Sequence, residues 1–229
     1  MANILVFAPH PDDEILGCGG SIIKHVKNKH KVFVCYLSNG EFGSPKYSPK
    51  KLFKIRKNEA IMVCEKIGIK KQNIFFLEIP DNQIMDTDTE KMKEIMSLVR
   101  KIKPGLVYLP HKNEKSFDHQ QAHVLIIRAL DMSGSNNFLK KDEKSWWVEN
   151  VLAYEIWTPL TDYQYGEDIS KVIDLKIKTL ELYKSQKSIE GNTSDFIGDK
   201  ASFLSGYRAA TSIGEFREVF KVIRIGKIL

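Results

Sequence analysis

Short apolar runs alternate with longer amphipathic stretches through most of the chain. Apolar runs bounded by turn residues are typical of strands buried on both faces of a sheet, whereas apolar residues that recur every three or four positions indicate helices. The pattern predicts strands at residues 4–7, 32–37, 74–77, 106–109, 151–156 and 218–225. It predicts helices at residues 14–28, 52–67, 89–101, 119–132 and 169–183.

This alternation of strands and helices predicts an α/β fold, with a Rossmann-like, doubly wound and mostly parallel sheet that carries helices on both faces. Residues 40–49, 133–145 and 185–205 are polar and are predicted to be loops, the first of them overhanging the end of the first strand. No repeat and no linker divides the sequence, so we expect a single domain over residues 1–229.

The composition is that of an ordinary globular protein, with 42% hydrophobic and 28% charged residues. No segment approaches the roughly 20 apolar residues of a membrane span, and we expect no signal peptide in the N-terminal residues. Cys18, Cys35 and Cys64 have no paired spacing, and Cys35 lies within an apolar run. A reducing, cytoplasmic environment fits these cysteines best.

The net charge of +6 raises the question of a nucleic-acid partner. The lysines are spread along the chain, and the densest cluster, at residues 50–57, lies on a predicted helix without the interleaved aromatic residues of a single-strand binder. We therefore expect a solvated lysine-rich surface and no nucleic-acid partner. Attraction of an anionic substrate, such as a sugar nucleotide or a phosphate, stays open.

Candidate chemistry is concentrated directly after the first predicted strand, in His10-Pro11-Asp12-Asp13-Glu14. Open α/β sheets bind ligands at the carboxyl ends of their strands, where this segment is expected to lie. A neutral imidazole and a carboxylate are good zinc ligands, and a second carboxylate can act as a base. The plainer interpretation is a polar turn that caps the next helix, but a cap needs one carboxylate and no histidine.

A glycine-rich segment, Gly17-Cys18-Gly19-Gly20, follows the same strand. It lacks the Gly-x-Gly-x-x-Gly fingerprint of dinucleotide-binding loops, and the acids before it would repel a pyrophosphate. We expect these glycines to allow close packing of a helix on the sheet, because glycine has no Cβ atom.

The segment from Ala8 to Glu14, followed by Leu16-Gly17-Cys18-Gly19-Gly20, resembles the signature of the LmbE/PIG-L family of zinc-dependent deacetylases. This first motif is specific, and weaker matches extend over nearly the whole chain. The resemblance implies the LmbE-like form of the α/β fold. The further matches are Leu37-Ser38-Asn39-Gly40-Glu41, Arg56-x-x-Glu59, Phe76-Leu77 with Pro80-Asp81, Asp118-His119, Tyr183-Lys184-Ser185-Gln186 and Tyr207-Arg208-Ala209.

A catalytic zinc takes three protein ligands and leaves one position for water. His10 and Asp13 supply two candidates, and His119, which follows the strand predicted at residues 106–109, is the best candidate for the third. The resemblance implies the same three ligands and assigns Asp12 as the general base. The expected cofactor is Zn²⁺, with another divalent metal left open.

The other histidines are weaker candidates. His123 shares a helical face with His119, but no glutamate follows the first histidine, so the zinc-protease motif is not formed. We expect His123 to support the ligands or the fold rather than to bind the metal. His25 and His30 are expected on the surface, and His111 is left open as a residue that lines the cleft.

One position departs from the family pattern. Many members have His-Pro-Asp-His where this chain has Ser116-Phe117-Asp118-His119, so Ser116 replaces a histidine that can polarise the oxyanion or protonate the leaving amine. Asp118 is expected to orient a neighbouring ligand. Arg56 and Asp81 match family positions associated with substrate contact, although a surface arginine and a turn aspartate explain them equally well.

The sequence predicts a zinc-dependent amidohydrolase that removes the acetyl group from an N-acetylated amino sugar or glycoconjugate, a small-molecule substrate. One alternative is a zinc amidase that acts on a larger acyl group or a thiol conjugate. Another is an inactive carbohydrate-binding descendant, although the intact Asp12 argues against it. A nucleotide-dependent oxidoreductase is disfavoured by the missing phosphate loop. The sugar, its aglycone, the native metal and a homo-oligomeric state stay open.

Overall fold

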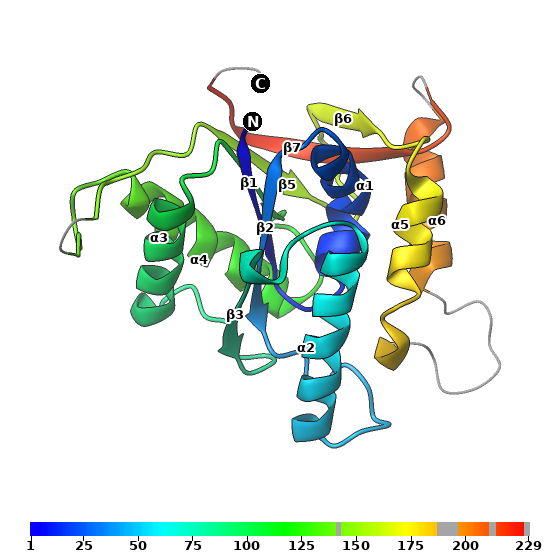
Figure 1. Ribbon diagram of the computed structural model, residues 1–229, viewed down its shortest axis with the longest axis horizontal. Helices are drawn as coiled ribbons and strands as arrows, with labels where there is room; N and C mark the ends of the chain where they lie inside the picture. Colours follow the sequence, from blue (N-terminus) through cyan, green and yellow to red (C-terminus); the bar gives the residue numbers. More distant parts are fainter. Residues whose placement is uncertain (141–142, 187–196, 211–213, 227–229) are drawn as a thin grey trace.

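A mostly parallel sheet forms the centre of the computed structural model, which describes residues 1–140, 143–186, 197–210 and 214–226 (Figure 1). Within these residues the sheet has seven strands in the order β3-β2-β1-β4-β5-β7-β6. The first five strands in the chain are parallel to one another, and β7 is antiparallel to both β5 and β6. The strands are β1 (Asn3–Ala8), β2 (Lys31–Ser38), β3 (Ile74–Ile79), β4 (Leu106–Pro110), β5 (Asn150–Tyr154), β6 (Tyr165–Asp168) and β7 (Arg217–Arg224).

Helices cover both faces of the sheet, so the described residues form three layers (Figure 1). On one face α1, α2, α5 and α6 pack against the sheet, and on the other face α3 and α4 do so. The helices are α1 (Asp13–Lys27), α2 (Pro49–Lys66), α3 (Thr89–Ile102), α4 (Phe117–Ser133), α5 (Ile173–Leu180) and α6 (Ile197–Ala209), with short 3₁₀ turns η1 (Lys71–Asn73) and η2 (Lys184–Gln186).

The central strand β1 is buried on both faces, as its continuous apolar run predicts. Ile4 and Val6 belong to the core under α1, α2 and α5, whereas Leu5 and Phe7 belong to the core under α3 and α4. Alternate side chains of a strand point to opposite faces, so one short run of residues joins the two cores. The predicted doubly wound α/β fold is confirmed.

Two elements differ from the sequence prediction. The helix predicted at residues 169–183 starts too early, because β6 ends at Asp168 and α5 begins at Ile173. The loop predicted at residues 185–205 is wrong in its second part, where α6 begins at Ile197; residues 187–196 lie outside the described part of the chain. β6 is a short edge strand of polar residues, and α6 exposes Phe203 and Tyr207, so neither shows the usual apolar pattern.

Other expectations from the sequence agree with the structure. Residues 40–48 have no regular structure and precede α2, as predicted for a loop. Cys18, Cys35 and Cys64 are buried and unpaired. Among the described helices, none combines the length and the apolar character that a membrane crossing needs.

The glycines of α1 allow this helix to lie close to the sheet, as expected. A Cβ atom on Gly17 would lie 2.1 Å from a ring carbon of Tyr154 on β5, and one on Gly20 would lie 2.5 Å from Ile169. Cys18 between them has non-helical dihedral angles, so α1 is kinked there. This packing fixes the start of α1 directly above the end of β1.

Candidate metal and catalytic site

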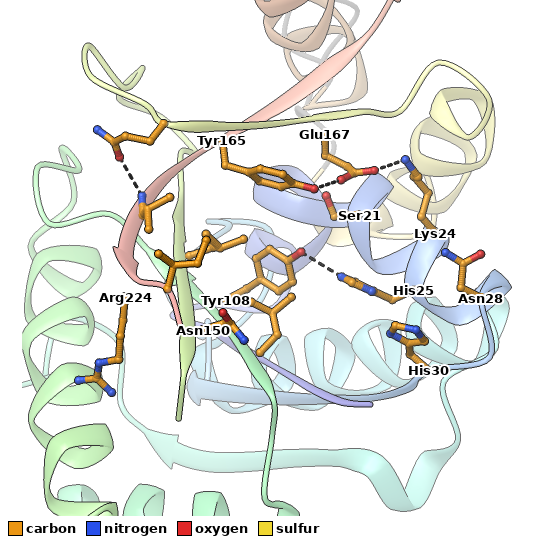
Figure 2. A pocket seen from close by; sticks show the side chains of 15 residues that line it. Ser21, Lys24, His25, Asn28, His30, Tyr108, Asn150, Tyr165, Glu167 and Arg224 are labelled. Carbon is orange, nitrogen blue, oxygen red and sulfur yellow. Dashed lines mark hydrogen bonds and ion pairs between the residues drawn. The ribbon is translucent and has the colours of Figure 1, made fainter. Parts of the chain in front are cut away.

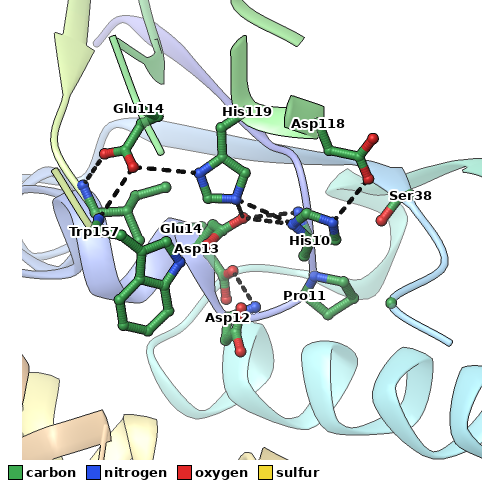
Figure 3. A network of polar contacts seen from close by, with 12 residues as sticks. His10, Pro11, Asp12, Asp13, Glu14, Ser38, Glu114, Asp118, His119 and Trp157 are labelled. Atoms are coloured by element: carbon green, nitrogen blue, oxygen red, sulfur yellow. Dashed lines mark hydrogen bonds and ion pairs between the residues drawn. The ribbon is translucent and has the colours of Figure 1, made fainter. Parts of the chain in front are cut away.

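A polar pocket of about 260 Å³ lies at the carboxyl edge of the parallel strands. Segments that follow β1, β2, β3, β4 and β5 all contribute to it, as expected where ligands bind to open α/β sheets. Figure 3 shows the polar network at its base. The pocket is lined by His10, Asp12, Asp13, Phe42, Gly43, Arg56, Asp81, Asn82, Ser116, His119, Trp157 and Gln186.

Three potential metal ligands form a compact triangle at the base of the pocket. Asp13 Oδ2 lies 3.3 Å from His10 Nδ1 and 3.2 Å from His119 Nε2, and the two histidine nitrogens are 3.2 Å apart. Ligands about 2.0–2.1 Å from a tetrahedral zinc ion would be separated by about 3.3 Å. Both the spacing and the His₂Asp chemistry therefore fit one divalent metal ion.

These three side chains carry unusual pKa values in the absence of an ion. Burial alone would lower the pKa of His10, but hydrogen bonds with Asp118 and Asp13 outweigh it and raise the pKa to about 9. Burial would also lower the pKa of His119, but the charge of Asp13 outweighs it and raises the pKa to about 10. Burial would raise the pKa of Asp13, but the neighbouring histidines lower it. A metal must therefore displace protons from this triangle.

Asp118 lies behind His10 on the side away from the triangle. Its Oδ2 atom is 3.2 Å from His10 Nε2, and it accepts hydrogen bonds from the backbone N–H groups of Asn82 and Ile84. A histidine that donates from one ring nitrogen to a carboxylate presents the other nitrogen to a metal in a fixed tautomer. His10 Nδ1 is accordingly the atom available in the triangle.

Glu114 supports the other histidine and was not anticipated from the sequence. Its Oε2 atom lies 3.7 Å from His119 Nδ1, and its carboxylate accepts hydrogen bonds from the backbone N–H groups of Ile156, Trp157 and Thr158. Burial would raise the pKa of Glu114, but hydrogen bonds, first with the side chain of His111, lower it to about 2. Glu114 therefore connects a candidate ligand to the segment that carries Trp157.

Asp12 has a strained backbone. It occupies the N-cap position of α1 with φ at 124°, yet its side chain makes no capping hydrogen bond. Its own N–H group donates to the buried carboxylate of Glu14. A positive φ is costly for a residue with a Cβ atom, and such strain is concentrated at functional sites. The side chain is thereby directed into the pocket rather than onto the helix end.

Asp12 is only 5% exposed, and burial raises the pKa of its carboxyl group to about 7. The charge of Arg56 opposes this rise, because Arg56 Nη2 lies 3.1 Å from Asp12 Oδ2. Arg56 is itself buried, and its guanidinium also donates to the backbone carbonyls of Pro11 and Gly40. A carboxyl group that titrates near neutral pH can both accept and return a proton.

Asp81 organises the loop above the pocket. Its carboxylate accepts hydrogen bonds from the hydroxyl of Ser38 and from the backbone N–H groups of Gly40 and Phe42. Its Oδ1 atom also lies 3.8 Å from His10 Nε2. Asp81 therefore lines the pocket while its main contacts are with the protein.

Two segments near the C-terminus that match the family pattern form hydrogen bonds or ion pairs at or beside the site. Ser185 donates from both its N–H and its hydroxyl to Glu59, which places the adjacent Gln186 in the pocket lining. Arg208 forms a two-point ion pair with Glu155 at the end of β5. The first of these segments thus reaches the pocket lining, and the second contacts Glu155, two residues before Trp157.

The structure also places the remaining candidates. Ser116, at the N-cap position of α4, is half-buried and lines the pocket. His111 and His123 are buried but do not line it: His111 Nε2 bonds to the carbonyl of Thr158, and His123 Nδ1 bonds to that of Pro110. The expectation that His25 and His30 lie on the surface is wrong, because both are half-buried and line a different cavity.

Comparison with known proteins agrees with this fold. The family described as PIG-L: GlcNAc-PI de-N-acetylase matches residues 5–130, more than half of the chain. The chain belongs to this family, which is the LmbE/PIG-L family that the sequence motifs resemble.

Two relatives carry sugar-deacetylase names. Diacetylchitobiose deacetylase of Thermococcus kodakarensis is 31% identical over 193 residues, covering 80% of this chain and 70% of the relative. The probable N-acetyl-alpha-D-glucosaminyl L-malate deacetylase 2 of Bacillus subtilis is 26% identical, covering 80% and 83%. The structure of N,N'-diacetylchitobiose deacetylase from Pyrococcus horikoshii, at 22% identity, has the same fold with a TM-score of 0.86, covering 97% of this chain and 84% of that chain.

Proposed function

We propose that this protein is a zinc-dependent hydrolase that removes the acetyl group from an N-acetylated amino sugar or its conjugate. The observation that carries the proposal is the triangle of His10, Asp13 and His119 beside the strained, buried carboxyl of Asp12. Membership of the PIG-L family and the names of its relatives support the same reaction.

In this proposal His10, Asp13 and His119 hold the ion. When bound, zinc supplies Lewis-acid activation of a water molecule and of the amide carbonyl. Asp12 accepts the proton of the attacking water as the new carbon–oxygen bond forms. It then delivers that proton to the amine nitrogen as the carbon–nitrogen bond breaks, which releases acetate and the free amino sugar. Arg56 holds the Asp12 carboxylate in place and favours its ionised form.

The pocket walls favour a sugar as the substrate. Trp157 is 45% exposed and Phe42 is also exposed, and both residues line the pocket. Aromatic faces of this kind bind the apolar face of a sugar ring, while Asn82 and Gln186 in the lining offer hydrogen bonds to hydroxyl groups. The Glu114 carboxylate accepts a hydrogen bond from the backbone N–H of Trp157 and also lies beside the candidate ligand His119. One carboxylate therefore positions both the Trp157 segment and His119.

Acetate release from purified, zinc-loaded protein tests the proposal. The substrates are N-acetylglucosamine, N,N'-diacetylchitobiose, N-acetylglucosaminyl malate and an N-acetylated sugar nucleotide, each compared with its N-butyryl analogue. We expect acetate from at least one N-acetyl sugar and slower turnover of the matching N-butyryl compound. Faster turnover of the N-butyryl compound would instead establish an amidase for larger acyl groups.

Because Ser116 replaces the motif histidine, a second candidate function is a sugar-binding protein that does not turn its ligand over. Binding of the same sugars, measured by calorimetry alongside acetate release, separates the two. Saturable binding with no acetate release in the zinc-loaded protein would overturn the enzymatic proposal.

A further inference from the structure

The start of α1 offers Asp12 a second, more ordinary conformation. An aspartate at the N-cap position usually has a negative φ, and its carboxylate accepts from backbone N–H groups in the first turn of the helix. Asp12 occupies that position, but its φ is 124° and its side chain makes no such hydrogen bond. Other contacts must therefore hold its backbone in the form that directs the carboxyl group into the pocket.

Glu14 provides one of these contacts. Its Oε2 atom accepts a hydrogen bond from the Asp12 N–H at 3.1 Å, as Figure 3 shows. The glutamate of a capping box reaches back to the N-cap N–H in the same way, although from the third rather than the second helical residue. Because the Asp12 carbonyl also accepts from the N–H of Leu16, the peptide groups on both sides of the Asp12 Cα atom are held.

Tyr183 orients the Glu14 carboxylate from a distant part of the chain. Its hydroxyl, 169 residues further along, donates to Glu14 Oε1 at 2.6 Å. Glu14 is fully buried and Tyr183 is 2% exposed. Turning the carboxylate away would leave a buried hydroxyl unsatisfied, so this contact restricts the orientation of Glu14. Tyr183 does not line the pocket, and its path to the site therefore runs through Glu14.

We propose that Tyr183 is a positioning residue for Asp12: its hydroxyl fixes Glu14, and Glu14 fixes the backbone that directs the Asp12 carboxyl group into the pocket. This role rests on the proposed function, because it takes Asp12 as the base. A small displacement of a reacting group slows catalysis strongly, even when the groups that bind the substrate stay in place. Tyr183 should therefore influence kcat although it does not line the pocket.

The first test removes the hydroxyl of Tyr183 from the full-length, zinc-loaded protein, assayed with the N-acetyl sugar that the wild type turns over best. Tyr183→Phe should lower kcat about tenfold, leave KM within about twofold and keep about one zinc ion per chain. A wild-type kcat in this variant would overturn the proposal.

Tyr108→Phe is the matched control. Tyr108 is also buried, and its hydroxyl lies 3.0 Å from His25 Nε2 in a separate cavity that shares no lining residue with the pocket (Figure 2). The same chemical change there should lower the melting temperature and leave kcat unchanged. An equal loss of kcat in Tyr183→Phe and Tyr108→Phe would show a general effect of stability and would overturn the proposal.

Substitutions of Glu14 separate hydrogen bonding from charge. Glu14→Gln keeps an oxygen for the Asp12 N–H and an amide that can donate to the Tyr183 hydroxyl, so kcat should stay within about threefold of wild type. Glu14→Leu removes both hydrogen bonds and should lower kcat about 100-fold. In that background Tyr183→Phe should cause no further loss, because the hydroxyl has nothing left to orient. A further loss of about tenfold, or a Glu14→Gln variant as slow as Glu14→Leu, would overturn the proposal.

A rival explanation is that Tyr183 acts through Gln186, which follows it in the same segment and lines the pocket. Ser185→Ala tests this, because Ser185 fastens the segment to Glu59. Loosening of Gln186 should raise KM, whereas misplacement of Asp12 should lower kcat. If Tyr183→Phe reproduces the KM of Ser185→Ala and keeps the wild-type kcat, the rival is correct and the proposal is overturned.

Crystal structures of the variants supply a readout that does not depend on turnover. In Glu14→Leu we expect Asp12 to adopt a negative φ, with its carboxylate at the N–H groups of the first turn of α1. An Asp12 φ that stays near 124° would overturn the proposal. If Glu14→Leu does not fold, Tyr183→Phe serves instead, with Glu14 Oε2 expected beyond about 3.5 Å from the Asp12 nitrogen. A wild type that releases no acetate would refute the proposed function, and the Asp12 backbone would still test the contact.

Discussion

The carboxylate of Asp12 and the guanidinium of Arg56 form a buried ion pair, with 3.1 Å between Oδ2 and Nη2. Burial raises the pKa of Asp12 to about 7, and the charge of Arg56 limits that rise. A general base must be ionised before it can accept a proton, so this pair sets the pH range in which Asp12 can work.

The first prediction follows from this ion pair. Activity should rise with pH through the pKa of Asp12, at or below about pH 7, since a bound metal ion lowers the pKa further. Arg56→Gln removes the opposing charge and should move the acidic limb of kcat/KM about one unit higher. Lys57→Gln, the adjacent residue paired with Glu78, removes the same charge outside the pocket and is the control. Identical profiles for both variants would contradict this role of Arg56.

The second prediction concerns competition between protons and metal. The pKa values of His10 and His119, about 9 and about 10 without metal, mean that both rings are protonated at pH 7. Metal binding should release protons, and the apparent affinity should increase about tenfold or more for each pH unit between 6 and 8. Competition with a chelating dye at several pH values measures this. An affinity that does not change over this range would argue against the His₂Asp site.

The third prediction separates the two adjacent aspartates. Asp13→Ala should lose metal, because Asp13 Oδ2 is one corner of the triangle. Asp12→Asn should keep metal and lose about 10²–10⁴-fold in kcat, because only proton transfer is removed. Metal content and acetate release are measured on the same preparations. A metal-free Asp12→Asn protein beside a metal-loaded Asp13→Ala protein would reverse the assignment.

The fourth prediction concerns Glu114. Glu114→Gln should weaken metal affinity about 10–100-fold through His119 and should raise KM by loosening the segment of Trp157. Because folding lowers the pKa of Glu114 to about 2, its contribution to stability is present above about pH 4.5 and is lost between pH 4.5 and 2. Lys115→Gln, an exposed neighbour, is the control for both measurements. Unchanged metal affinity in Glu114→Gln would limit this residue to a structural role.

The fifth prediction addresses the missing motif histidine. Ser116→Ala should reduce kcat about tenfold or less, as expected for the loss of one neutral hydrogen bond. His111 and His123 bond to backbone carbonyls and do not line the pocket, so neither should replace the absent imidazole. His111→Ala and His123→Ala are therefore expected to lower the melting temperature and to leave kcat nearly unchanged. A thousandfold loss of kcat with full metal content in either variant would identify that histidine as the acid.

The sequence was sufficient to predict the parts of the fold that repeat a strong local pattern. The continuous apolar run of β1 marks a strand buried on both faces, and the motif after it marks the carboxyl edge. β6 and α6 were missed because an edge strand and a partly exposed helix bury too few apolar side chains to produce a regular pattern.

Residues that act through long-range contacts were harder to predict. Glu114 is a single acid in a polar loop, and its role arises only because the chain after β5 returns to it. His25 and His30 end a lysine-rich helix and resemble surface residues, yet strands far along the chain enclose them. In both cases the burial is determined by segments distant in sequence, which local composition does not reveal.

The backbone of Asp12 has a practical consequence for protein engineering. Glycine accepts a φ of 124° without steric cost, but Asp12→Gly would also leave the buried Arg56 guanidinium without its ion-pair partner. The substitution that relieves this position thus eliminates the proposed base. A selection for heat resistance alone would therefore favour replacing Asp12 and Arg56 together, which yields inactive clones, so any directed-evolution scheme for this protein should screen for turnover and thermal tolerance together.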